Sequence, residues 1–120
     1  MIKQMESLKI SVRHFYSAEK ALQSFKKSPK EYDLIITDLI VEGRLNGMGL
    51  IREIRKIYPD HSKLPILVVS GYDAPRRIEL LRIGANDYIV KPLIKQELSA
   101  RLSNLITTKQ LFDQVKIQQE

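Results

Sequence analysis

The chain has 120 residues, of which 43% are hydrophobic and 28% are charged, and its formal net charge is +6. This length holds one domain with a core rather than two, and the absence of cysteine excludes disulfides and thiolate metal sites. No apolar run approaches the roughly 20 residues of a membrane helix and the N-terminus lacks a signal-peptide pattern, so a cytoplasmic domain outside the membrane is expected. Lysine and arginine are scattered and often stand beside acids, which favours a solvated surface over a nucleic-acid interface.

The first half of the chain alternates strand and helix patterns. Residues 10–15 predict a short strand, and Ser17 is placed to cap the helix that follows. The apolar residues of that helix recur at helical spacing: Ala18, Ala21, Leu22 and Phe25. Residues 34–37 predict a buried strand, and a second amphipathic helix ends before Pro59. The apolar face of this second helix consists of Leu50, Ile51, Ile54 and Ile57.

The second half continues the alternation. Residues 65–70 (PILVVS) predict a strand that is buried on both faces. Asp73 is placed to cap a third helix, and Gly84 is placed to end it. Residues 88–90 predict a short strand, and a last helix is expected from about Lys95 towards the C-terminus. Strands that alternate with helices of about ten residues predict an α/β fold with a parallel sheet and helices on both of its faces.

Three polar side chains end successive predicted strands. In open parallel sheets ligands bind outside the carboxyl ends of the strands, so Asp38, Ser70 and Lys91 are expected to converge in one crevice. A carboxylate, a hydroxyl and an ammonium group together favour phosphoryl transfer. The carboxylate attacks phosphorus, a divalent cation and the lysine neutralise the phosphoryl oxygens, and the hydroxyl donates one further hydrogen bond.

At these residues the chain resembles the receiver domain of bacterial two-component response regulators, over roughly residues 10–106. The matching motifs are DLIITDL, LPILVVSGY and GANDYIVKP, in that order. The resemblance implies a flavodoxin-like (βα)5 receiver fold. It also implies that Asp38 accepts a phosphoryl group from a histidine kinase or a phosphotransfer protein.

The resemblance further implies roles for the residues around Asp38. Ser70 takes the place of the switch residue that turns towards the phosphoryl group, and Tyr88 is the aromatic residue that swings inward with it. Lys91 contacts the phosphate, and the peptide bond between Lys91 and Pro92 is cis. The surface made by the last helices and strands then changes for a partner.

The same resemblance implies Mg²⁺ as the cofactor. Ile40 offers its backbone carbonyl to Mg²⁺ beside the Asp38 carboxylate. Ile40 and Tyr72 flank the site and help to set the lifetime of the phosphoryl group, and Gly71 stands where a small residue is usual. Family members begin with an apolar strand that ends in two adjacent acids, which hold the metal. Here that acidic pair and strand are absent, so magnesium binding is expected to be weak unless the acids are supplied from elsewhere.

The expected fold is therefore incomplete at its N-terminus. In the flavodoxin-like strand order 2-1-3-4-5 the first strand is central, and its loss leaves unpaired backbone groups in the middle of the sheet. Three solutions stay open. The strand belongs to a longer parent protein, the segment 10–15 moves in beside 34–38 to give a four-stranded sheet, or a second copy fills the gap. If that segment moves inward, Glu19 approaches the metal site.

The receiver pattern ends near Ile106, so we expect a receiver-like domain over residues 1–106 and a helical extension or linker over 107–120. The extension continues an apolar stripe formed by Leu98, Leu102, Leu105, Phe112 and Val115. A coiled-coil stalk leading to an output domain and a solvated helix end are both open interpretations of it.

The sequence thus predicts a phospho-accepting signalling switch rather than an enzyme with ordinary turnover. The alternative is a pseudo-receiver that keeps the fold and a partner or dimer surface without phosphorylation, and the absent acids favour it for the chain as given. A phosphohydrolase with an aspartate nucleophile needs a second carboxylate two residues on, where this chain has Ile40. The expected partners are a histidine kinase or phosphotransfer protein, a second copy through the last helices or strand exchange, and an output domain in a longer parent.

Overall fold

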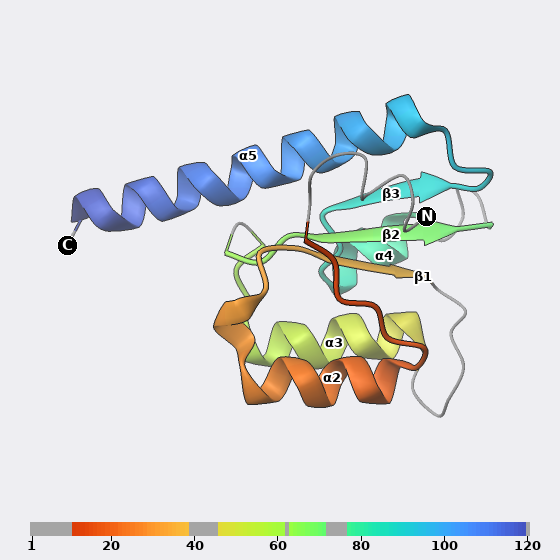
Figure 1. Cartoon of the computed structure of the whole chain (residues 1–120), viewed down its shortest axis with the longest axis horizontal. Coiled ribbons are helices and arrows are strands. Elements are labelled where there is room, and N and C mark those ends of the chain that lie inside the picture. Colours follow the sequence, from red (N-terminus) through yellow and green to blue (C-terminus); the bar gives the residue numbers. More distant parts are fainter. Residues whose placement is uncertain (1–10, 39–45, 62, 72–76, 120) are drawn as a thin grey trace.

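The structure is a computed structural model that describes residues 11–38, 46–61, 63–71 and 77–119. Its strands are β1 (Ile35–Asp38), β2 (Ile66–Ser70) and β3 (Asp87–Val90), and they form one parallel sheet in the order β1-β2-β3. The helices are α2 (Ala18–Lys27), α3 (Gly47–Ile57), α4 (Arg77–Ile83) and α5 (Lys95–Gln119), with a short 3₁₀ turn η1 (Pro29–Glu31). Figure 1 shows α2 and α3 on one side of the sheet and α5 on the other. The predicted fold class, an incomplete flavodoxin-like sheet with helices on both faces, is confirmed.

Side-chain caps set the start of the first two helices. The Ser17 hydroxyl accepts a hydrogen bond from the Lys20 backbone N–H at 3.2 Å, as the sequence predicts. The Asn46 side chain accepts one from the Gly49 N–H at 2.8 Å and starts α3. α3 then ends at Ile57, two residues before Pro59. The expected cap at Asp73 lies outside the described residues.

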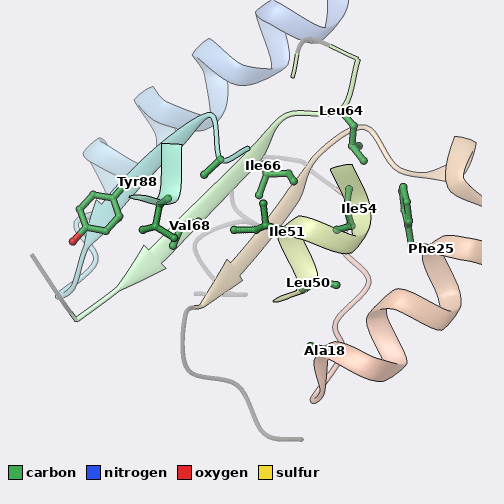
Figure 2. Close-up of a cluster of buried hydrophobic side chains, with 11 residues drawn as sticks. Ala18, Phe25, Leu50, Ile51, Ile54, Leu64, Ile66, Val68 and Tyr88 are labelled. Carbon is green, nitrogen blue, oxygen red and sulfur yellow. The ribbon is translucent and has the colours of Figure 1, made fainter. Parts of the chain in front are cut away.

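The main core lies between the sheet and the helices α2, α3 and α4. Figure 2 shows side chains of this core that come from the sheet and from the helices on this face: Phe25 of α2, Ile51 and Ile54 of α3, Ile66 and Val68 of β2, and Tyr88 of β3. All of these are buried. Full burial of one such side chain stabilises a fold by roughly 1.5–3 kcal/mol, so this layer holds α2 and α3 against the sheet.

A second core covers the opposite face under α5. Its buried members are Leu67 of β2, Ile89 of β3, and Leu98, Leu102 and Leu105 of α5. On the same face Leu34 and Ile36, next to and within β1, are only partly buried. The helix therefore covers β2 and β3 more completely than β1.

The strand predicted over residues 10–15 is wrong for residues 11–15, which have no regular structure. Instead Val12 packs against the second core. The Arg13 guanidinium lies over the rings of Phe15 and Tyr32 and pairs with Glu31 at 3.3 Å. These tertiary contacts outweigh a weak strand propensity, so among the described residues the segment does not supply the strand of a four-stranded sheet, which was one of the three open solutions.

Arg55 ties the end of α3 to the turn before β3. Its guanidinium donates hydrogen bonds to the Gly84 carbonyl at 2.9 Å, the Tyr58 carbonyl at 3.2 Å and the Asn86 side-chain oxygen at 2.9 Å. Asn86 Oδ1 also accepts the Ile66 N–H at 3.0 Å, which links the same turn to β2. Burial lowers the pKa of Arg55 to about 10, so the guanidinium stays charged at neutral pH.

The last helix runs without a break from Lys95 to Gln119 and so crosses the predicted domain boundary at Ile106. In its first half Leu98, Leu102 and Leu105 are buried, whereas in its second half Leu111 is 56% exposed and Val115 is 51% exposed. Figure 1 shows the second half extending past the sheet. The boundary and the coiled-coil interpretation stay predictions. Among the described helices, none is both long enough and apolar enough to cross a bilayer.

Candidate functional site

The carboxyl ends of the three strands bring the predicted site residues to one edge of the sheet. Asp38 ends β1, Ser70 ends β2, and Lys91 directly follows β3. The Lys91 N–H donates a hydrogen bond to the Ser70 carbonyl at 2.7 Å, which holds the end of β3 to β2. The Lys91 side chain then spans the middle strand, and its Nζ lies 2.5 Å from Asp38 Oδ2. The structure therefore joins Asp38 and Lys91 in an ion pair above the end of the strand that carries Ser70.

This ion pair is accessible to solvent. The side chain of Asp38 is 26% exposed and that of Lys91 is 48% exposed. The carboxylate is thus within reach of a molecule arriving from solution, and the ammonium group lies directly beside it. Fixed cations at such a position are an effective way to stabilise a charged transition state.

Ser70 and Tyr88 occupy the same face of the sheet. Val68 pairs with Tyr88, and Ser70 lies two residues further along β2, so its side chain points to the same side. Ser70 is 1% exposed and Tyr88 is 8% exposed. For the next residue, Gly71, a Cβ built on the backbone meets no described atom within 4 Å.

Other predicted features of the site are the Lys91–Pro92 peptide bond and the residues Ile40, Tyr72 and Glu19. The peptide bond between Lys91 and Pro92 is cis. Ile40 and Tyr72 lie outside the described residues, so the structure does not test their predicted roles. Glu19 lies in the first turn of α2.

The donor groups described at this edge do not by themselves make a magnesium site. Within the described ranges no three His, Cys, Asp or Glu side chains gather as metal ligands would. Asp38 contributes one carboxylate, and that carboxylate is paired with Lys91. Mg²⁺ in proteins needs near-octahedral oxygen ligation, so further ligands have to come from outside this set.

One hydrogen-bonded residue beside the site, Thr37, was not singled out from the sequence. Thr37 is 5% exposed, and its hydroxyl donates to the Asp38 carbonyl at 2.9 Å. The only signal for it was a hydroxyl residue inside an otherwise apolar strand.

Asp87, at the start of β3, accepts the Tyr88 N–H at 2.8 Å and pairs with Arg101 of α5 at 3.1 Å. This pairing joins two elements that are distant in sequence, so no local pattern indicates it. It ties α5 to the strand that carries Tyr88.

Comparisons with known proteins point to one family. The family model for the response regulator receiver domain matches residues 1–103. The chain is 36% identical over 111 residues to the regulatory protein VanR of Enterococcus faecium, covering 92% of this chain and 45% of VanR. It is 36% identical over 102 residues to the two-component response regulator PhoP of Pseudomonas aeruginosa, covering 84% of this chain and 43% of that protein. The chain thus spans less than half the length of these curated relatives.

The fold agrees with that match. A crystal structure of a response regulator receiver domain protein from Clostridium thermocellum superposes with a TM-score of 0.81 at 29% identity, covering 91% of this chain and 84% of that chain. The family match and the fold of this chain therefore agree. The chain belongs to the response regulator receiver domain family of two-component systems.

Proposed function

We propose that this chain is a phosphoryl-accepting switch in which Asp38 is the acceptor. The observation that supports this most directly is the ion pair between Asp38 and Lys91 at the carboxyl edge of a parallel sheet. An Asp38 carboxylate oxygen attacks the phosphorus of a phosphohistidine donor and forms a P–O bond. The P–N bond breaks, and the leaving imidazole keeps the electron pair and takes up a proton. Lys91 stays beside the phosphoryl oxygens and balances part of their charge.

The switch part of the proposal concerns Ser70 and Tyr88. A new dianionic group draws a hydroxyl towards it, and the volume that the hydroxyl leaves is open to a neighbouring aromatic ring. Their positions on one face of adjacent strands support this pairing. The ion pair that Arg101 of α5 makes with Asp87 offers a route by which movement around Tyr88 reaches α5.

The test is the intact mass of the protein after incubation with Mg²⁺ and acetyl phosphate. We expect a gain of one phosphoryl group that is absent in Asp38→Asn and slowed by roughly 10²-fold in Lys91→Ala, the typical effect of losing one charge-stabilising group. The matched control is Lys95→Ala, which removes an exposed lysine at the start of α5. An equal gain in Asp38→Asn would place the phosphoryl group elsewhere and contradict the proposal.

A phosphorylation-independent pseudo-receiver is the second candidate. The lack of a cluster of three or more metal-ligating side chains among the described residues, and the pairing of Asp38 with Lys91, favour it. It predicts that the folded protein gains no phosphoryl group and still binds its partner with Asp38→Asn as strongly as without the substitution. A mass gain confined to proteins that retain Asp38 would exclude it.

Partners and location follow from family membership and remain proposals. A histidine kinase or phosphotransfer protein would supply the phosphoryl group, a second copy would associate through the last helices or by strand exchange, and an output domain would be part of a longer parent. We propose a cytoplasmic location on the same basis. Mg²⁺ would bind weakly to this chain, because further ligands have to join Asp38.

A further inference from the structure

Thr37 makes a local side-chain hydrogen bond at the end of β1. Its hydroxyl donates to the carbonyl oxygen of the next residue, Asp38, at 2.9 Å, and its side chain is almost completely buried. Side-chain hydroxyls that bond nearby backbone groups offer the chain an alternative to the sheet ladder. β1 ends at Asp38, directly after the residue that makes this bond. The bond therefore holds the last peptide of the strand at the point where the candidate acceptor is presented.

We infer that Thr37 is a positioning residue for Asp38, a role that rests on the phosphoryl-acceptor function proposed above. Fixing the Asp38 carbonyl fixes the peptide plane attached to its Cα, and so the direction in which its side chain leaves the backbone. That direction decides whether the carboxylate meets Lys91 Nζ, which comes from the far side of β2. Misplacing a reacting group by about 1 Å can cost up to 10²-fold in rate.

The experiment compares three variants of the full chain. Thr37→Val keeps the β-branched shape and removes the donor, whereas Thr37→Ser keeps the donor. Thr108→Val is the matched control, because the Thr108 hydroxyl makes the same kind of bond to a backbone carbonyl, that of Asn104, at 3.0 Å in α5. Two readouts are taken: the rate of phosphoryl gain from acetyl phosphate with Mg²⁺, and the NMR signals of the Asp38 amide and the Lys91 ammonium before any phosphoryl donor is added.

We expect Thr37→Val to slow phosphoryl gain by about tenfold and to shift both signals, with Thr37→Ser within about twofold of the unmodified chain and Thr108→Val unchanged. Unmoved signals together with an unchanged rate in a folded Thr37→Val would overturn the inference. A rate loss that Thr37→Ser fails to restore would also overturn it, because packing rather than the hydroxyl would be responsible. If the unmodified chain gains no phosphoryl group, the proposed function fails and the NMR signals alone decide the role of Thr37. If Thr37→Val does not fold, Thr37→Ala takes its place against Thr37→Ser.

Discussion

At the scale of single residues, Gly84 is required both by its backbone conformation and by the side chain that packs against it. Its φ is +124°, a region that residues with a Cβ rarely adopt, and a Cβ there would lie 2.5 Å from Cγ of Arg55. The sequence indicates a glycine that stops a helix, and the structure adds that this glycine makes room for the side chain that holds α3, α4 and β3 together. No local pattern could have indicated that second role, because Arg55 is 29 residues away in the sequence.

We therefore expect Gly84→Ala to lower the free energy of unfolding by roughly 1–3 kcal/mol, through backbone strain and displacement of the Arg55 side chain. Gly71→Ala is the matched control, because among the described residues no atom lies within 4 Å of the added methyl group. Urea denaturation followed by circular dichroism measures both. Equal midpoints for the two variants would contradict the strain argument.

His61 gives a prediction about pH. Partial desolvation of its ring and then the charge of Arg55 lower the pKa of His61, while Asp60 acts in the opposite direction. The unfolded chain consequently holds the proton more tightly, so stability falls as the pH drops below the unfolded value of about 6.5 towards the lower folded value.

Urea midpoints at pH 8, 6.5 and 5.5 test this. The loss of stability on acidification should be smaller in His61→Asn, and the two proteins should differ least in slope above pH 7. A steeper loss in His61→Asn would show that protonation of His61 stabilises the fold, opposite to the expected sign.

At the scale of elements, capping and periodicity predict the helices α2, α3 and α5 well, because these signals act within a few residues. The strands β1 and β2 follow from apolar runs, since both of their faces meet other layers. The segment 11–15 shows the limit of such patterns. The conformation of this segment depends on the packing of Val12 against the second core and on the contact of Arg13 with Tyr32. The alternation of apolar and polar residues within the segment does not indicate such distant contacts.

For the candidate site, the sequence predicts the convergence of Asp38 with Lys91 because strand ends in a parallel sheet share one edge. It does not predict Thr37 or the pair of Asp87 with Arg101, which depend on hydrogen-bond geometry. A family motif marks the positions whose side chains are expected to react or bind. Thr37 instead bonds a backbone carbonyl, and Asp87 pairs with a residue of another helix.

The two halves of α5 should contribute very differently to stability. Leu102 is 1% exposed under the sheet, whereas Leu111 is 56% exposed on the part that extends past it. We expect Leu102→Ala to cost about 2–5 kcal/mol of unfolding free energy and Leu111→Ala to change it by less than about 0.5 kcal/mol. Thermal and urea denaturation measure the pair. A large loss in Leu111→Ala would mean that this half of the helix is covered in solution by another copy or segment.

At the scale of the whole molecule, the open question is what lies beside β1. Among the described residues β1 ends the sheet, whereas the flavodoxin-like strand order 2-1-3-4-5 places a further strand there. In a parallel strand the N–H groups of alternate residues point to opposite sides. The Ile35 N–H bonds the Pro65 carbonyl on the β2 side, so the Ile36 N–H points to the other edge.

Amide hydrogen exchange therefore reports on that edge. If no strand pairs with β1 in solution, the Ile36 amide should exchange much faster than the Ile35 amide, and β2 should be the most protected strand. Similar protection at both residues would show that a strand does pair there. Repeating the measurement across protein concentrations then separates a segment of the same chain, which gives constant protection, from a second copy, whose protection rises with concentration.

The extended α5 also has a mechanical consequence. The helix is anchored along one end by leucines in the second core, and its free part beyond Leu105 is roughly 20 Å long at 1.5 Å per residue. A tilt of about 10° at the anchored end therefore moves the far tip by roughly 3–4 Å. A displacement too small to disturb the packing of the domain becomes, at that distance, large enough to break or make a contact at the tip of the helix.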